Sequence, residues 1–549
     1  MNRLARSLIF ASLAALPIAL APRTADAFCG FYVAPNDAPL YNDASMVALM
    51  REGTRTVMSM SNNYKGPATD FAMVVPVPVV LQKENVKTLP LDTFQKLEAL
   101  SAPRLVEYWE QDPCTPNYAN EEKSVMAPSA MASGGASMDD KAKDYGVKIE
   151  AKFTVGEYNI LVLSAQQSDG LESWLHDNNY NIPKGASSAL APYIKEQQKF
   201  FVAKIDIKKV KMDQQGVAVL SPLRFAFESQ DFRLPVRLGL LNAKAKQDLI
   251  VFVLAQNKRY EVANYPNVFI PTNIDVTDDT RNAFGPFYAT LFDATIAKAG
   301  GKAVVTEYSW VSSSCDPCPT PPLEENDVAT LGGDVLFGMG VPDPTANGPG
   351  NPGGPPGGGM GGYYGGNSQN IVLTRLHTRY DQQTLTDDLV FRSADAVVGG
   401  REFVVNDNGE LEKGARKDSE NNFQGRYAIR HPWTGPINCD NPRRQIWGGP
   451  PGNQYGMSSP LPATNLASAP RGNLKLADHV TRGLDDVDSY DRAVQWSYAG
   501  NGAPPPVKGH ACGCSLPGTS TTLGALSGLS IGALVLAIAR RRRRGNGNA

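Results

Sequence analysis

A strict alternation of apolar and polar residues between positions 147 and 155 places the tightest limit on the fold. Val147, Ile149, Ala151, Phe153 and Val155 are apolar, and the residues between them are polar. Only an extended strand turns alternate side chains to the same face, so the pattern predicts a half-buried β-strand. A Gly-Glu pair then leads into a second apolar stretch at 158–164, which predicts an antiparallel hairpin.

The rest of the chain contains more strand patterns than helix patterns. Strands are predicted at 55–62, 71–81, 200–210, 217–228, 236–241, 249–255, 260–262, 304–310, 371–380, 389–392, 402–405 and 425–430. Helices are predicted at 36–51, 92–100, 105–109, 168–178, 186–199, 278–299 and 324–331. Pro76 and Pro78 restrict the second half of 71–81 to a sheet edge or an extended segment. The helices cluster between groups of strands without a regular β-α-β repeat, which favours an α+β fold with a largely antiparallel sheet.

Glycine and proline divide the chain into parts. The 51 Gly and 41 Pro residues are partly concentrated at 338–366, and such a stretch has no content from which a core could form. We therefore expect an α+β domain at 28–330, a Gly/Pro-rich linker at 331–369, and a smaller β-rich part at 370–447. This part is expected to pack on the main domain or to continue it. Residues 448–511 are rich in Pro, Gly and Ser and are predicted to form a stalk.

The N-terminus has the layout of a secretory signal peptide. Arg3 and Arg6 precede an apolar run at 8–21, and Ala25-Asp26-Ala27 forms a small-residue cleavage site. We expect residues 1–27 to be removed after Ala27. Export would place the chain in a compartment where disulfide bonds persist.

The C-terminus predicts membrane attachment. The apolar stretch 523–539 would reach about 26 Å as a helix, just enough to span a bilayer. The cysteines Cys512 and Cys514 precede it, and a cluster of five arginines follows it, namely Arg540, Arg541, Arg542, Arg543 and Arg544. The positive-inside rule keeps these arginines in the cytoplasm.

The cysteine motif, the apolar span and the arginine cluster at 512–549 together resemble the MYXO-CTERM sorting signal of exported myxobacterial proteins. That resemblance implies cleavage near the cysteines by a sorting protease and retention at the cell surface. The alternative is a permanent inner-membrane tail anchor whose main body faces the periplasm.

Seven cysteines in an exported chain indicate disulfides more than metal or redox chemistry. The candidate disulfide cysteines are Cys29, Cys114, Cys315, Cys318 and Cys439, with Cys29–Cys114 and Cys318–Cys439 as suggested pairs. The sequence does not fix the connectivity. Redox activity of the Cys-Asp-Pro-Cys motif stays open as a third function, which would fail if both cysteines were buried or bridged to distant partners. Zinc binding there would need His431 and Cys439 as further ligands.

No catalytic, cofactor-binding or metal-binding constellation is predicted. The histidines are scattered and are expected to be surface or packing residues: His176, His377, His431, His479 and His510. The acids Asp275, Asp278 and Asp279 fit helix capping better than metal binding. Calcium binding by the acids at 485–491 is a weaker hypothesis than a solvated acidic patch. The aromatic groups at 108–109, 284–288 and 431–433 suit core packing by default, with stacking on sugars as the functional alternative.

Four stretches resemble the bacterial family DUF2330. They are FCGFY at 28–32, APRLVEYW at 102–109, DFRLPVRLG at 231–239 and YPNVFIPT at 265–272. The resemblance covers about residues 28–330 and extends toward 450. It implies export and a shared fold, and no activity or catalytic residue comes with it.

These patterns favour a binding or structural protein of the envelope over an enzyme. A net charge of −2 argues against a nucleic-acid partner. The expected partners are the membrane, a sorting protease, and an envelope glycan or protein ligand, with no cofactor. The alternative is an extracytoplasmic enzyme that acts on envelope polymers or peptides. An open cleft lined by paired carboxylates would favour the enzyme, and an aromatic or hydrophobic patch would favour the binding protein.

Overall fold

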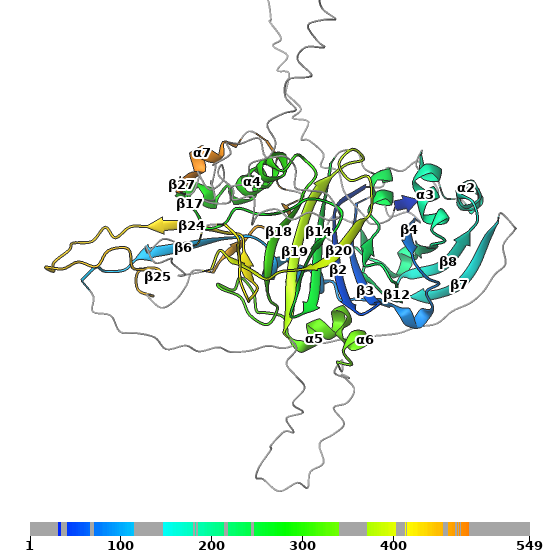
Figure 1. Cartoon of the computed structure of the whole chain (residues 1–549), viewed down its shortest axis with the longest axis horizontal. Coiled ribbons are helices and arrows are strands. Elements are labelled where there is room, and N and C mark those ends of the chain that lie inside the picture. The colour runs from blue at the N-terminus through cyan, green and yellow to red at the C-terminus, as the bar shows by residue number, and fades with distance from the viewer. Residues whose placement is uncertain are drawn as a thin grey trace, which may run out of the picture. The chain divides into compact units, whose positions relative to one another are not determined.

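The computed structural model describes residues 31–33, 41–65, 71–114, 146–212, 218–242, 246–339, 370–401 and 412–482 (Figure 1). Short gaps fall at 179, 181, 183–184, 413, 454–458, 467–468, 470 and 473. The chain divides into two compact units, 1–504 and 505–549, and every described residue belongs to the first. The predicted signal peptide, Cys29, most of the linker and the sorting signal with its apolar stretch 523–539 lie outside the described residues. In the described part, no helix is long and apolar enough to cross a membrane.

The largest sheet forms the centre of the first unit. Its order is β22 (Arg416–Lys417), β21 (Val397–Gly399), β23 (Asn422–Gln424), β18 (Val304–Val311), β19 (Ile371–Tyr380), β14 (Gln247–Gln256), β2 (Tyr41–Glu52), β3 (Arg55–Lys65), β12 (Leu223–Glu228) and β5 (Val86–Thr88), with β16 (Asn267–Phe269) also on β18. Most neighbours are antiparallel, whereas β14–β2, β16–β18 and β21–β23 are parallel. The predicted α+β class with a largely antiparallel sheet is confirmed.

A second sheet contains the hairpin that the alternation predicted. Its order is β1 (Phe31–Val33), β4 (Ala72–Val77), β9 (Lys199–Ile205), β8 (Tyr158–Ala165) and β7 (Val147–Val155). β7 and β8 pair antiparallel, which confirms the hairpin. β1 pairs only with residues 72–74 of β4, so Pro76 lies beyond its end and requires no ladder donor on that side.

The two sheets pack face to face and are covered by helices on their outer faces. Their shared core contains alternate residues of β2, β3 and β14 against alternate residues of β4, β8 and β9. The outer face of the second sheet packs on α2 (Ser168–Asp177) and α3 (Ala186–Lys195). The outer face of the large sheet packs on α1 (Asp92–Ser101) and α5 (Glu325–Val328). Each fully buried Leu, Ile or Phe in these layers contributes about 1.5–3 kcal/mol of transfer free energy.

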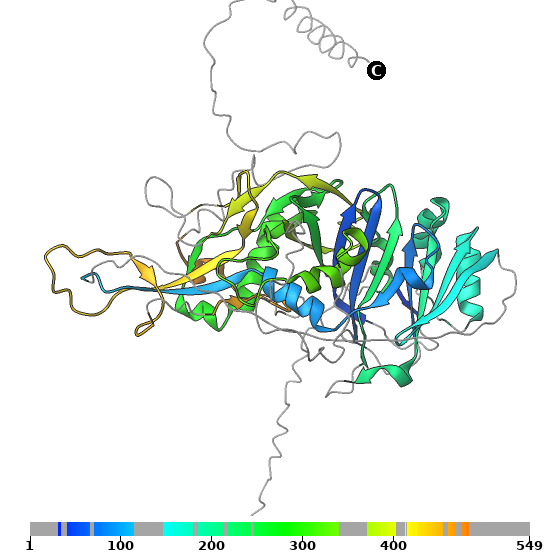
Figure 2. The same cartoon turned by 90° about the horizontal axis from the view of Figure 1, so that it is seen from below.

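A third sheet extends beside the large one. Its order is β25 (Trp447–Gly448), β6 (Arg104–Glu110), β24 (Arg426–His431), β17 (Ile274–Val276) and β27 (Val480–Arg482), with β26 (Leu461–Pro462) also on β6. The helices α4 (Phe284–Lys298) and α7 (Leu476–His479) pack against this region. Figures 1 and 2 show β6 and β24 side by side, directed away from the large sheet.

The remaining elements are short. They are β10 (Lys211–Met212) with β11 (Ala218–Val219), the sheet β13 (Arg233–Leu234), β20 (Leu389–Ala394) and β15 (Arg259–Val262), the 3-10 helices η1 (Lys83–Asn85), η2 (Ile207–Lys209), η3 (Arg237–Asn242) and η4 (Asp278–Arg281), the π-helical turn η5 (Ala329–Gly333) and α6 (Asp334–Leu336).

Three predicted elements are wrong. The predicted helices at 36–51 and 105–109 are the strands β2 and β6, and the predicted strand at 236–241 is the 3-10 helix η3. β2 lies inside the large sheet with apolar layers on both faces, so Val47 and Leu49 face one core while Ala48 and Met50 face the other. A strand that is buried on both faces reads as a continuous apolar run, which by periodicity resembles a helix.

The strands after residue 370 pair with strands that come earlier in the chain. β19 lies between β14 and β18, near the middle of the large sheet. The predicted stalk at 448–511 also differs from the structure over its first part. Ala463 and Leu466 are buried in the same core as α4, and β26 and β27 pair with β6 and β17. A Pro/Gly/Ser-rich composition resembles that of a stalk, but a few apolar side chains suffice to hold the segment on the fold.

Candidate functional site

The best candidate for a binding site is an arm formed by β6 and β24 together with residues 111–114 and 432–448. β6 and β24 pair in parallel, from Arg104 opposite Arg426 to Trp109 opposite His431. Partners in a parallel ladder point to the same face of a sheet. Two aromatic groups from distant parts of the sequence, at 108–109 and 431–433, therefore meet on the arm.

One face of the arm presents a stacked aromatic pair beside charged groups. The rings of Trp109 and His431 stack with centroids 4.7 Å apart and an interplanar angle of 22°. His431 Nε2 lies 3.0 Å from Glu107 Oε2, and Arg281 also bonds to that carboxylate. His431 Nδ1 lies 3.9 Å from the exposed Asp278. Both stacked residues are half-buried, and the side chain of His431 is 23% exposed.

The opposite face holds a cation between two aromatic rings. The guanidinium of Arg430 lies 5.5 Å from the ring centroid of Tyr108 and 4.9 Å from that of Trp447. Arg430 Nε also donates to Asp275 Oδ1 at 3.0 Å. A guanidinium at these distances from a ring is attracted by the negative face of its π-system. Tyr108 and Trp447 thus belong to the packing of the arm and hold β25 against β6.

Glu110 orders the loop at the end of the arm. Its carboxylate accepts two hydrogen bonds from Arg444 at 2.8 Å each, and it also accepts the backbone N–H groups of Trp433 at 2.9 Å and Gln445 at 2.7 Å. The hydrogen bonds from Arg444, with those two backbone donors, outweigh burial and lower the pKa of Glu110 to about 2. Because charge-assisted and bidentate bonds are geometrically specific, this carboxylate fixes where Trp433 sits.

A disulfide closes the arm and corrects the predicted connectivity. Cys114, just after β6, bonds to Cys439, in the loop after β24, with their Cα atoms 5.6 Å apart. Cys315 bonds to Cys318. The suggested pairs Cys29–Cys114 and Cys318–Cys439 are therefore wrong. The parallel pairing of β6 with β24 brings together two cysteines separated by 325 positions, which no local pattern indicates.

The third aromatic group of the sequence belongs to the core. Phe284, Phe287 and Tyr288 on α4 surround Tyr427 of β24 with ring centroids 5.6–5.9 Å apart. Of the clustered acids, Asp278 and Asp279 lie in the first turn of η4, whose N-cap residue is Thr277, while Asp275 forms ion pairs with Arg430 and Arg482. The acids at 485–491 lie outside the described residues. In the part that the structure describes, no group of three His, Cys, Asp or Glu residues is placed to hold a metal.

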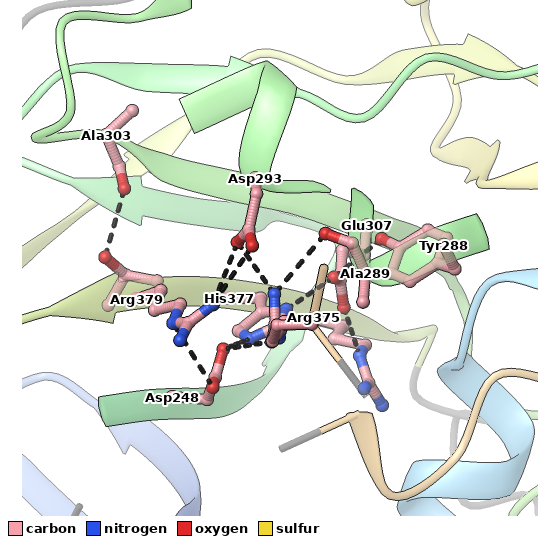
Figure 3. A network of polar contacts seen from close by, with 11 residues as sticks. Asp248, Tyr288, Ala289, Asp293, Ala303, Glu307, Arg375, His377 and Arg379 are labelled. Carbon is pink, nitrogen blue, oxygen red and sulfur yellow. Dashed lines mark hydrogen bonds and ion pairs between the residues drawn. The ribbon is translucent and has the colours of Figure 1, made fainter. Parts of the chain in front are cut away.

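A second polar cluster, which sequence reasoning missed, is buried between the large sheet and α4 (Figure 3). Its buried centre contains Asp248 of β14, Glu307 of β18, Arg375 and His377 of β19, and Tyr288 of α4. Its partly exposed rim contains Arg379 of β19, Asp293 of α4 and Arg471. We call it the buried network. A signal existed in the sequence: alternate residues of β19 at 375, 377 and 379 are basic, so they share one face and require acidic partners there.

His377 lies at the centre of the buried network between two carboxylates. Its Nδ1 atom is 2.7 Å from Glu307 Oε1, and its Nε2 atom is 3.0 Å from Asp248 Oδ1. The ring stacks on Phe292 with centroids 3.9 Å apart. Two acceptors require a proton on each ring nitrogen. Burial opposes this charge, but Glu307 and Asp248 outweigh burial and raise the pKa of His377 above 6.5.

Glu307 receives three donors at a bulge of β18. The register between β18 and β19 shifts between Thr306 and Tyr308, which leaves Glu307 as the extra residue. Its carboxylate accepts from Arg375 Nε at 2.5 Å, from Tyr288 Oη at 2.7 Å and from His377. Burial alone would raise the pKa of Glu307, but His377 and Arg375 lower it to about 2. The acid is thus ionised at any physiological pH.

The rim of the buried network ties a distant segment to the core. Arg471 donates to Asp293 at 2.7 Å and to Asp248 at 3.1 Å, and Arg379 donates to Asp293 at 3.0 Å. Burial opposes ionisation of Asp248, but His377 and Arg471 lower its pKa nevertheless. A general base must reach its substrate within hydrogen-bond distance. His377 and Glu307 have no exposed surface and are occupied by internal partners, so we assign this cluster to stability.

Comparisons with known proteins add the family but no function. Neither the curated proteins nor the solved structures contain a match to this chain. A family model described as "Uncharacterized protein conserved in bacteria (DUF2330)" matches residues 23–392. The match extends past the Gly/Pro-rich stretch and includes β19, which agrees with the place of that strand inside the large sheet. β24 and the arm loop lie beyond it. Because the match covers more than half of the sequence, the chain belongs to the DUF2330 family of uncharacterised bacterial proteins.

Proposed function

We propose that this chain is an exported protein, anchored at the cell surface, that binds an envelope glycan through its arm. The observation that carries the proposal is the half-buried stack of Trp109 on His431, flanked by Glu107 and Asp278. The signal-peptide pattern at 1–27 and the sorting pattern at 512–549 support export and anchoring.

The chemistry of this face suits a carbohydrate. An indole ring offers a broad apolar surface on which the C–H face of a sugar ring can stack, while its N–H bonds to polar groups. Carboxylate and imidazole groups beside the ring can bond to the surrounding hydroxyls. Trp433, whose backbone N–H donates to Glu110, supplies a second half-buried indole in the loop after β24.

The arm also has the rigidity that a recognition surface requires. The disulfide Cys114–Cys439 and the bonds of Glu110 hold the loop in place before any ligand arrives. A preordered surface loses less conformational entropy on binding than a mobile one does. The alternative of an enzyme that uses paired carboxylates has less support, because Asp248 and Glu307 are buried and neutralised by cations.

Binding to purified glycans tests the proposal. The full chain is incubated with insoluble peptidoglycan and with immobilised cell-surface polysaccharide, and the bound fraction is measured by sedimentation. We expect Trp109→Ala and Trp433→Ala each to reduce binding about tenfold. Phe227→Ala is the matched control, because Phe227 is a half-buried aromatic residue of β12 outside the arm. Equal binding by the control and both tryptophan variants would refute the assignment of the arm.

The processing of the two ends is tested separately. Mass spectrometry of the protein isolated from cell fractions should find an N-terminus at Phe28. Sorting predicts a surface form that has lost the arginines 540–544, whereas a permanent tail anchor predicts an intact C-terminus in the inner membrane. A mature protein that retains residues 1–27 would contradict export.

A further inference from the structure

The Cys315–Cys318 disulfide differs in kind from the disulfide of the arm. Its cysteines are three positions apart in the loop that follows β18, whereas Cys114 and Cys439 are 325 positions apart. A bond across three positions restricts few conformations of the unfolded chain. Cys318 is exposed and Cys315 is half-buried, so a thiol from outside can reach the pair. The condition under which redox activity would fail, burial of both cysteines or distant partners, is not met.

A buried cation lies against this loop. The side chain of Arg104, at the start of β6, has no exposed surface, and its Nη1 atom donates to the carbonyl oxygen of Pro317 at 2.6 Å. The second terminal nitrogen donates to the carbonyl oxygen of Leu100 at 2.7 Å. Both acceptors are neutral carbonyls, while the carboxylate of Asp316 in the same loop favours the charged guanidinium and partly balances its charge. Burial lowers the pKa of Arg104 to about 10, which still leaves it charged at neutral pH.

The loop is also held from its other side. Gln424 of β23 donates its side-chain amide to the carbonyl oxygen of Asp316. Two side chains from separate strands thus bind successive carbonyls between the cysteines, Asp316 and Pro317. This fixes the backbone of the loop while its outer sulfur faces solvent, an arrangement in which the disulfide can open without loss of the fold.

We propose that Cys315 and Cys318 form a thiol–disulfide exchange site that accepts two electrons from the dithiol of another protein. A thiolate of the partner attacks Sγ of Cys318, forms a mixed disulfide and breaks the Cys315–Cys318 bond, and the released Cys315 thiolate takes up a proton. The second thiol of the partner then loses its proton and attacks the partner sulfur of the mixed disulfide, which releases Cys318 as a thiolate that is protonated in turn. The partner ends with a disulfide and this chain with two thiols.

The geometry favours this order of events. Cys318 is the exposed residue, so its sulfur is the accessible target, and exchange depends on which sulfur can be reached. The leaving sulfur gains negative charge, and a nearby cation lowers the free energy of a thiolate. Arg104 bonds to the loop at Pro317, two residues from Cys315, and acts from a buried position, where electrostatic interactions are stronger than in water. Asp316 lies between the cysteines with the opposite charge, so the proposal requires that Arg104 outweigh it at the leaving sulfur. The proposal is independent of glycan binding by the arm.

Stepwise reduction of the native full chain is the main test. The chain is titrated with reduced dithiothreitol, free thiols are alkylated, and each cysteine peptide is quantified by mass spectrometry. We expect the Cys315–Cys318 bond to be reduced at a dithiothreitol concentration at least tenfold below that which reduces Cys114–Cys439. Reduction of both bonds together, or only after unfolding by urea, would overturn the proposal.

Two single variants test the direction of attack. Cys315→Ser leaves Cys318 as a free exposed thiol, and it should form a mixed disulfide with oxidised glutathione at least tenfold faster than Cys318→Ser does. The wild-type chain should oxidise a reduced two-cysteine peptide in equal molar amount, and the double variant Cys315→Ser/Cys318→Ser should leave it reduced. A wild-type chain that leaves this peptide reduced, or a faster reaction of Cys318→Ser, would refute the mechanism.

Substitution of Arg104 tests its role as a positioning cation. Arg104→Lys keeps the charge and should reduce the rate of peptide oxidation less than Arg104→Gln, for which we expect about a tenfold loss. Circular dichroism establishes that both variants are folded before rates are compared. Equal rates for the two variants would remove Arg104 from the proposal, and the wild-type titration would still decide whether the site exchanges.

Discussion

Replacement of Glu307 by glutamine should destabilise the fold more than any change at a surface ion pair. The substitution keeps the size of the side chain and removes the charge that faces His377 and Arg375. The fold holds the pKa of Glu307 at about 2, against an ordinary value of 4.5. At about 1.4 kcal/mol for each pKa unit, this preference for the charged form corresponds to about 3 kcal/mol at neutral pH.

The loss of a partner from a buried ion pair gives a free-energy change of the same magnitude. Removing one partner of a buried ion pair typically costs about 3–5 kcal/mol, because the other charge stays buried without compensation. Here Arg375 and His377 both lose their carboxylate, and neither has any exposed surface through which water could replace it. We therefore expect the free energy of unfolding to fall by about 3–5 kcal/mol.

Equilibrium unfolding in urea at pH 7, followed by tryptophan fluorescence, measures this change as a shift of the midpoint. Glu228→Gln is the matched control, because Glu228 forms an exposed ion pair with Arg55 at 3.0 Å, and its midpoint should not move. The double variant Glu307→Gln/Arg375→Met should recover part of the loss, since it removes a stranded cation. If Glu307→Gln shifts the midpoint no further than Glu228→Gln, the buried network does not stabilise the fold as described.

Three further predictions concern the buried network, the glycine at position 400 and the disulfide of the arm. Stability should be greatest between about pH 4.5 and 6.5 in urea titrations. The pKa of Glu307 is lowered in the fold, so its contribution to stability is lost as pH falls from 4.5 toward 2. The pKa of His377 is raised in the fold, so its contribution is lost as pH rises above 6.5. In thermal unfolding, Gly400→Ala should cost at least about 2 kcal/mol, because φ is +67° and a Cβ atom would lie 2.1 Å from a backbone oxygen. Gly300→Ala, with φ +79° and nothing within 4 Å, should cost only the backbone strain of about 1 kcal/mol; equal costs would contradict the close approach. Cys439→Ser should lower stability by about 2–5 kcal/mol and speed proteolysis within 432–446, and an unchanged digestion pattern would show that the disulfide does not order the arm loop.

Local patterns predicted the elements whose periodicity is unambiguous. The alternation at 147–155 predicted β7 and its hairpin with β8, and Phe94, Leu97 and Leu100 on one face of 92–100 are all buried in α1. The restriction of the second half of 71–81 to a sheet edge or an extended segment agrees with β1, which pairs only with residues 72–74 of β4. These features depend on residues a few positions apart, so the sequence contains all the information that they need.

The sequence predicted only separate parts of the arm. The aromatic groups at 108–109 and 431–433 were recognised as candidates for packing or sugar stacking, but nothing local indicates that they meet. Their meeting depends on the parallel pairing of β6 with β24, and the segment that became β6 was predicted as a helix. The same pairing brings Cys114 and Cys439 together.

The sequence by itself determined that this chain folds as a mainly antiparallel α+β protein, and its ends predict export and anchoring. The tertiary structure alone decided that β2 is a strand, that β19 inserts between β14 and β18, and that His377 is a buried, doubly bonded centre. The partners of His377 lie 70 and 129 positions away along the chain. Periodicity predicts which side of a helix or strand is buried. The residues that pack against this side depend on long-range strand pairing, which is fixed only when the whole sheet assembles.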